Sequence, residues 1–145
     1  YGRRVSGWYG MTNNTAGTTI TTANTYYKVA GTTTAYYLNG TGHSTNRFAT
    51  ISGSPTVYMM MNVSLTASHN SASSNETISF ALALNGSVLT NQVVYAQVAP
   101  NTATNFSING MNPLNATQYM EVWCTAGTSG TVITVQNMSV SFVAV

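Results

Sequence analysis

Five side chains of this sequence are carboxylates, imidazoles or thiols, the groups that most often act as acids, bases or metal ligands near neutral pH. They are Glu76, Glu121, His43, His69 and Cys124, and the 145 residues include no aspartate. A Ser-His-Asp triad would therefore lack the acid that orients its histidine. Glu76 and Glu121 are the one pair of carboxylates that could cleave a glycoside, but we expect them to be surface or interface carboxylates that accept hydrogen bonds. The sequence predicts no catalytic residues and no enzyme.

The same residues are a poor set of metal ligands. Zinc would need His43, His69 and a third ligand brought together, and calcium would need several clustered carboxylates. We expect both histidines to lie in loops. A single cysteine excludes an intrachain disulfide, and Cys124 lies in a strand-like run, where we expect a small buried hydrophobe. No glycine-rich phosphate loop precedes a helix, as a nucleotide cofactor would need. The sequence therefore predicts neither a bound metal nor a cofactor.

The chain has very little charge. Charged residues make up only 4% of it, and Thr, Asn, Ser and Gln supply a neutral surface that forms hydrogen bonds. Four scattered cations, Arg3, Arg4, Lys28 and Arg47, cannot neutralise a row of phosphates together, which excludes nucleic acid as a partner. No run of about 18 apolar residues is present, so no membrane insertion is expected. A net charge of +2 instead favours self-association.

A period of two in the apolar residues predicts strands along most of the chain. The clearest case is residues 57–65, where every second residue is apolar. Asn85-Gly86 between two apolar runs is the strongest short signal for a hairpin. Further strands are predicted at 26–29, 34–38, 47–51, 78–84, 87–89, 93–98, 104–108, 118–126 and 132–145, with turns at Asn39-Gly40, 53–55, Asn109-Gly110, Asn112-Pro113 and 127–130.

These strands predict an all-β fold. About eight to ten short antiparallel strands with regularly spaced turns point to a jelly-roll sandwich, and no window has a helical period with caps. Residues 1–20, which contain four glycines, are expected to form an N-terminal arm or linker. Residues 21–145 are expected to form a single β-sandwich domain.

Two patterns suggest contacts beyond the core. Met60 lies between Met59 and Met61 and so faces the other side of its strand. Both faces of that strand are expected to be buried, one in the sandwich and one against another subunit, which predicts an oligomer. Aromatic residues have two interpretations, stacking on sugar rings or packing in the core and against subunits, of which packing is the more frequent. They occur at Trp8-Tyr9, Tyr26-Tyr27, Tyr36-Tyr37 and Trp123.

Several segments together resemble a recurring domain of bacteriophage virion structural proteins, found in tail fibres and head-surface proteins. They are residues 26–34, 46–55, Leu84-Asn85-Gly86 and 118–123. The likeness covers roughly residues 20 to 145 and extends to the jelly roll of the tumour-necrosis-factor (TNF) and complement globular-head type. Such domains often carry an acidic residue where this chain has Gln118, which puts the chemistry of that interface in doubt.

The resemblance implies a non-enzymatic protein on the virion surface, outside the cell. It implies a homotrimer with Tyr58, Met60, Tyr119 and Trp123 as candidate residues of the trimer interface. The partners would be other virion proteins and host-surface glycans, for either a capsid decoration protein or the head of a fibre that binds its receptor. The alternatives are a secreted binding module, TNF-like or like a complement globular head, and a glycan-active enzyme.

Overall fold

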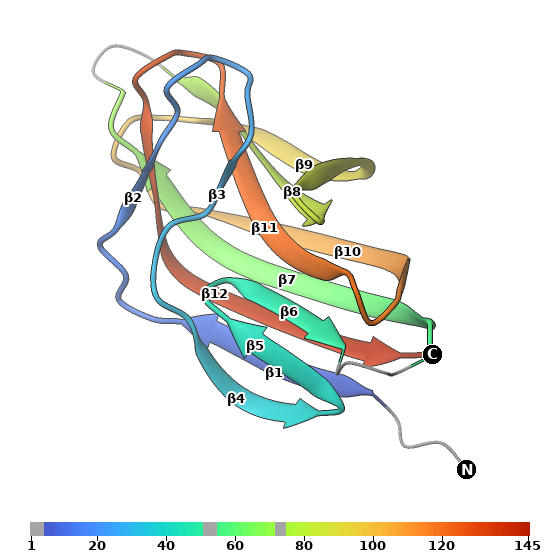
Figure 1. Ribbon diagram of the computed structural model, residues 1–145. Coiled ribbons are helices and arrows are strands. Elements are labelled where there is room, and N and C mark those ends of the chain that lie inside the picture. Colours follow the sequence, from blue (N-terminus) through green and yellow to red (C-terminus); the bar gives the residue numbers. More distant parts are fainter. Residues whose placement is uncertain (1–4, 51–54, 72–74) are drawn as a thin grey trace.

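The computed structural model describes residues 5–50, 55–71 and 75–145, and over these residues the chain is a sandwich of two antiparallel sheets without a helix (Figure 1). Sheet A has the order β10 (Thr104–Leu114), β7 (Val57–His69), β12 (Val132–Ala144), β1 (Ser6–Met11) and β4 (Thr34–Asn39), and β2 (Gly17–Thr19) also pairs with β12. Sheet B has the order β5 (Thr41–Ser44), β6 (Arg47–Thr50), β11 (Tyr119–Ala126), β8 (Glu76–Leu84) and β9 (Ser87–Val98), with β3 (Tyr27–Lys28) beside β11.

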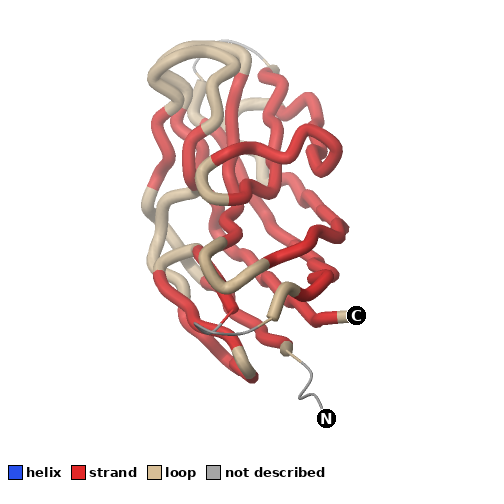
Figure 2. The backbone as a smooth tube through the Cα atoms, turned by 45° about the vertical axis from the view of Figure 1, so that its right-hand side comes forward, coloured by secondary structure: helices blue, strands red, loops and turns tan. Residues whose placement is uncertain are grey.

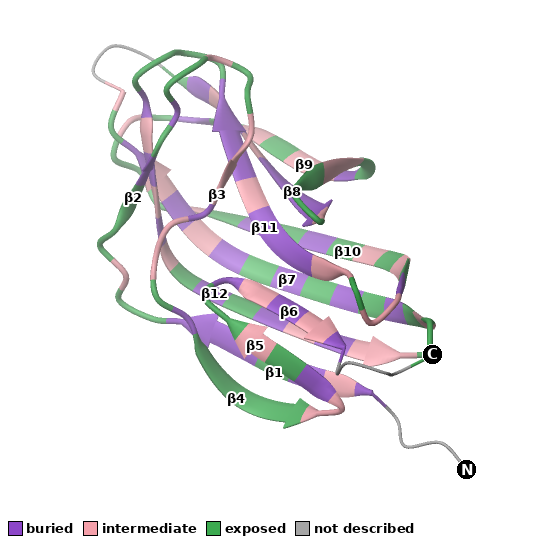
Figure 3. Cartoon of the chain, in the orientation of Figure 1, coloured by how far each residue is buried: buried purple, intermediate pink, exposed green. Residues whose placement is uncertain are grey.

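The predicted alternation places the core between the sheets. Along β7 the odd-numbered residues from Met59 to His69 are buried, while the even-numbered ones are exposed or half-buried (Figure 3). The sandwich closes around aromatic rings, because Phe48 of sheet B stacks on Phe142 of sheet A with 3.8 Å between ring centroids. Gly7 is required here, since a Cβ at this position would collide with the Phe142 ring. The expectation of an all-β jelly roll is confirmed.

The structure differs from the arm predicted for residues 1–20. Residues 1–4 lie outside the described part, but β1 is an inner strand that pairs with both β12 and β4. Its inward residues are Gly7, Tyr9 and Met11, and its outward ones are Ser6, Trp8 and Gly10. Two glycines hide the alternation in the sequence because they add no side chain to either face. The sandwich thus begins near the first described residue, not at residue 21.

Turn signals were reliable only where the chain reverses. Asn85 and Gly86 have φ values of 50° and 80°, as a tight β-hairpin turn requires. Asn109-Gly110 and Asn112-Pro113, however, lie inside β10, so the turns predicted there are wrong. The reason is that β10 is an edge strand that pairs only with β7 in sheet A. An edge strand tolerates a proline, whose missing N–H is not needed on the open side.

Both ends of the described chain lie at the same end of the sandwich (Figure 2). Ala144 N donates to Val5 O at 2.7 Å, and Val145 N donates to Tyr58 O at 2.9 Å. These bonds hold the last residues against the start of β1 and β7. Within the described residues, no helix is long and apolar enough to cross a membrane.

Candidate functional site

An apolar patch covers one end of the outer face of sheet A. The register places Met111, Met60 and Val143 in one row across β10, β7 and β12, and Pro113 beside Tyr58 in the next row. The side chains are open to solvent, with Tyr58 60% exposed, Met111 49% and Met60 38%. We call Tyr58, Met60, Met111, Pro113, Val143 and Val145 the apolar patch. Exposed apolar patches on the surface of a soluble domain are candidate interaction surfaces.

The four residues expected at a trimer interface fall on two different faces. Tyr58 and Met60 belong to the apolar patch on sheet A. Tyr119 and Trp123 are half-buried on β11 in sheet B, whose inward positions are taken by Met120 and its even-numbered neighbours. The four therefore do not form one continuous surface.

Instead of a plain apolar contact, Tyr119 and Trp123 flank an ion cluster on the outer face of sheet B. The Glu121 carboxylate is only 2% exposed and accepts from both cations of the described residues. Its Oε2 lies 2.6 Å from Arg47 Nη2, 2.7 Å from Arg47 Nε and 3.1 Å from Lys28 Nζ. Trp123 Nε1 donates to Oε1 at 2.9 Å, and the Arg47 guanidinium lies 3.8 Å from the centroid of the Tyr119 ring.

These contacts decide the charge state of Glu121. Burial raises the pKa of the Glu121 carboxyl. Hydrogen bonds from Trp123, Arg47 and Lys28, together with the charge of Lys28, lower the pKa by more than burial raises it, so the pKa lies below the usual value. Glu121 is therefore an ionised structural group at neutral pH.

Glu76 and Glu121 do not form a pair of catalytic carboxylates. Glu121 lies opposite Ala83, and Ala83 is about 23 Å from Glu76 along β8 at about 3.3 Å per residue. Glu76 also faces inward with Ile78 and Phe80, where its Oε2 accepts from Thr128 Oγ1 at 2.9 Å. Paired glycosidase carboxylates lie at most about 9.5 Å apart. This geometry excludes a mechanism that uses the two together.

Neither histidine is in a loop, which corrects the expectation. His43 lies in β5, where Thr33 Oγ1 is 2.7 Å from its Nε2 and burial lowers its pKa. His69 ends β7 and is 2% exposed, with its Nε2 2.6 Å from Val98 O and its Nδ1 accepting from Ser71 N. Among the described residues, no three His, Cys, Asp or Glu side chains come together.

Cys124 is fully buried in β11, as expected. Burial raises the pKa of its thiol to about 12, although a hydrogen bond with Thr18 lowers it. We expect the folded protein not to react with a disulfide reagent at neutral pH, because the thiolate is the nucleophile. In guanidinium chloride one thiol per chain should react, as measured by absorbance. Fast reaction of the folded protein would contradict this burial.

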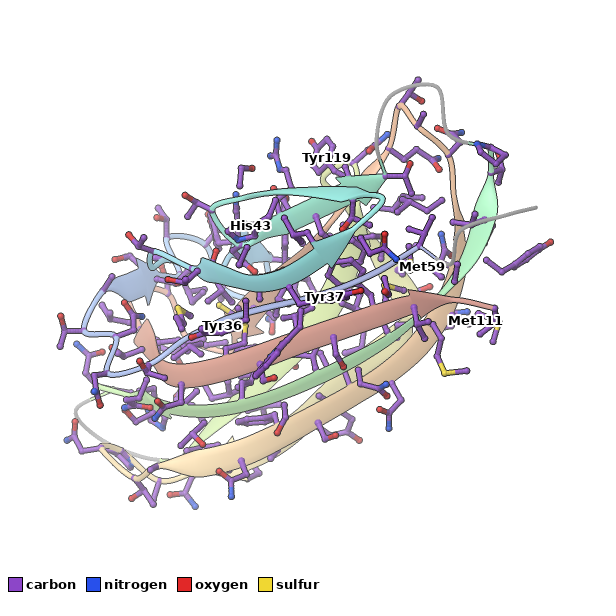
Figure 4. All side chains as sticks on the ribbon, turned by 90° about the horizontal axis from the view of Figure 1, so that it is seen from below. Tyr36, Tyr37, His43, Met59, Met111 and Tyr119 are labelled. Carbon is purple, nitrogen blue, oxygen red and sulfur yellow. The ribbon has the colours of Figure 1, made fainter. Side chains whose placement is uncertain are left out.

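A groove of about 470 Å³ lies farther along the outer face of sheet A. Trp8 and Tyr36 form one wall, with ring centroids 4.8 Å apart, and are 46% and 48% exposed. Tyr36 and Tyr37, both labelled in Figure 4, are neighbouring residues of β4. Trp8 and Tyr36 are among the aromatic residues for which the sequence favours packing in the core or against subunits over stacking on sugar rings. Met111 was missed because the turn signals on either side of it concealed the strand.

Comparison with solved structures finds the same architecture in murine APRIL. The crystal structure of murine APRIL at pH 5.0 matches with a TM-score of 0.65 and 9% identity over 99% of this chain and 100% of that one. The structures at pH 8.5 and pH 8.0 match over the same shares, with TM-scores of 0.56 and 0.52 and identities of 6% and 7%. No protein-family model and no curated protein matches the sequence. At these identities the likeness concerns the fold alone: the chain is a TNF-like jelly roll.

Proposed function

We propose that this chain is a non-enzymatic, TNF-like binding module that assembles as a homotrimer. The observation that carries the assembly is the apolar patch, which exposes Tyr58, Met60 and Met111 side by side on sheet A. The patch contains no charged side chain, so a second copy of the chain would bury it without leaving a charged side chain unpaired. The low net charge of the chain supports self-association in the same direction.

One argument favours three copies, and a second concerns how the copies would be joined. The jelly roll of the TNF and complement globular-head type, which the sequence resembles, packs in threes around an axis. In a ring of three copies, each copy contacts one neighbour through one surface and the other neighbour through a different surface. The apolar patch is one of these surfaces. It replaces the four-residue interface of the sequence analysis, since Tyr119 and Trp123 face the other way.

The assembly is tested by introducing charge into the patch. We expect the unmodified protein to have about three times the 15.3 kDa mass of one chain at micromolar concentration, by light scattering or mass photometry. Met60→Asp should give a folded monomer, because a carboxylate buried in an apolar contact has no partner. Tyr95→Asp is the matched control, since Tyr95 is 73% exposed on sheet B and should leave the mass unchanged. A monomeric unmodified protein would refute the proposal.

A finer proposal places the module on a virion surface, with other virion proteins or host-surface glycans as partners. The sequence feature that favours an exposed particle site is the lack of any Lys or Arg after Arg47, which leaves no trypsin site in that part of the chain. Electron microscopy of the intact particle would test this placement. A particle that lacks the module, together with a soluble trimer in the culture medium, would favour the alternative of a secreted TNF-like or complement-like binding module.

A further inference from the structure

The groove on sheet A has the chemistry of a small binding site. Its wall is the exposed aromatic pair Trp8 and Tyr36, and its rim carries the hydroxyl groups of Ser64 and Thr66 and the carboxamide of Asn137. Apolar side chains also line it, and none of the lining residues is charged or a histidine. Ligand sites of this size combine apolar walls with a few polar groups that orient the ligand.

The aromatic wall is held in place by the strands beneath it. Trp8 Nε1 donates to Ser139 Oγ at 2.9 Å, which fixes the indole ring against β12. Between Trp8 and Tyr9 the pairing with β4 shifts by one residue, so that Tyr36 is the extra residue of a β-bulge. Gly10 makes room for the Tyr36 ring, because a Cβ there would lie 3.3 Å from Tyr36 Cε2 and would collide with the Met138 carbonyl. The rings are therefore positioned before any ligand arrives.

This combination matches one class of ligand. A pyranose ring has an apolar face of C–H groups, which the electron-rich faces of aromatic rings attract, and a rim of hydroxyls that exchange hydrogen bonds with hydroxyl and amide groups. A phosphate or carboxylate ligand would require a cation, and the two cations of the described residues, Lys28 and Arg47, are held by Glu121 on the other sheet. The ligand that fits the groove is neutral.

We propose that the groove beside Trp8 and Tyr36 binds a neutral saccharide. This inference names the ligand class of the proposed binding module and rests on that proposal, but it does not depend on the number of copies. The two surfaces are separate on sheet A, since Ser64 lies about 13 Å along β7 from Met60. The row of Asn109, Asn62 and Ser141 lies between them.

Saturation-transfer NMR on the unmodified full chain is the direct test, with the methyl glycosides of glucose, galactose, mannose and N-acetylglucosamine as probes. We expect at least one probe to receive saturation, mainly on its ring C–H protons. Trp8→Ala should weaken that binding by about tenfold or more, since aromatic anchors dominate small interfaces. Tyr95→Ala, which removes an aromatic ring that is even more exposed than Trp8 but lies on sheet B, should leave binding unchanged.

A second variant separates recognition from folding. Asn137→Ala removes a rim carboxamide from an exposed position and should weaken saccharide binding several-fold. The circular dichroism spectrum and the mass of the assembled protein should stay unchanged. Binding that survives Trp8→Ala would overturn the inference. So would binding of a methyl sialoside, used as a charged comparison probe, that is lost in Lys28→Ala while the neutral probes do not bind. An unmodified protein that forms trimers but binds none of the probes would overturn it too, and would leave the assembly proposal standing.

Discussion

Replacing Asn46 with alanine is expected to lower the free energy of unfolding by about 3 kcal/mol and the melting temperature by about 10 °C. Asn46 is fully buried at the turn between β5 and β6. Its Nδ2 donates to Val29 O at 3.2 Å and to Val122 O at 3.0 Å, and its Oδ1 accepts from Tyr9 Oη at 3.3 Å. Alanine would leave two buried polar groups, Val29 O and Tyr9 Oη, without this partner, while Val122 O keeps its bond from Val29 N at 3.0 Å. Each unpaired group costs about 1 to 3 kcal/mol.

Tyr9 shows why the loss is not repaired locally. Burial, and after it the charge of Glu121, raises the pKa of Tyr9 far above its usual value, so the hydroxyl stays protonated and needs an acceptor. The ring itself is fixed in the core beside Phe48 and Phe142. Without Asn46, its hydroxyl would have to remain unpaired or admit a water molecule.

The controls use the backbone conformation of Asn46, whose φ is 47°. Asn46→Gly removes the same carboxamide but accepts this φ without strain, so the difference from Asn46→Ala isolates the backbone cost. Asn13→Ala has a similar φ of 52° at an exposed position and should cost less than half as much. Thermal melts at one fixed protein concentration measure all three, because assembly makes the melting temperature depend on concentration. Equal losses in Asn46→Ala and Asn13→Ala would contradict the role of the buried carboxamide.

Replacing Glu121 with glutamine should cost about 2 kcal/mol at pH 7, because it leaves Lys28 and Arg47 without their counterion. The cost is less than for a fully buried pair, since the two cations are 32% and 39% exposed and water screens them in part. Trp123 Nε1 keeps an acceptor in the glutamine oxygen, so the main loss is electrostatic.

The same cluster predicts an acid-dependent loss of stability. The pKa of Glu121 is lower in the folded state than in the unfolded chain, where the pKa of a glutamate is about 4.3. Its contribution is therefore fully present above the unfolded pKa and is lost as the pH falls through the folded pKa. The unfolded state binds more protons between these two values, so the free energy of unfolding decreases with falling pH in that window.

Urea unfolding at pH 7, 5 and 3 tests this dependence. The free energy of unfolding of the unmodified protein should decrease below about pH 4. Glu121→Gln should be less stable at pH 7, and its free energy of unfolding should change much less between pH 5 and pH 3. Glu76→Gln is the matched control, since these are the two acidic side chains of the chain and Glu76 accepts from a threonine instead of a cation. An unchanged decrease at acid pH in Glu121→Gln would show that the ion cluster does not govern the pH dependence.

The sequence by itself determined the fold class, and much of what faces inward. Alternation along residues 57–65 predicted the buried and exposed sides of β7. The Asn85-Gly86 pair predicted the hairpin between β8 and β9. These features are local, because side chains alternate along any extended strand and a tight turn depends on the φ values of two residues. The shortage of charge was likewise evident from composition.

Only the tertiary structure decided which outward residues share a surface. Tyr58 and Tyr119 both alternate outward, but one lies on sheet A and the other on sheet B, so the predicted interface separates into two. Strand order brings Trp8 beside Ser139 and Arg47 beside Glu121, over separations of 131 and 74 residues. Alternation carries no information about the neighbouring strand, because pairing across a jelly roll depends on how the whole chain closes its core.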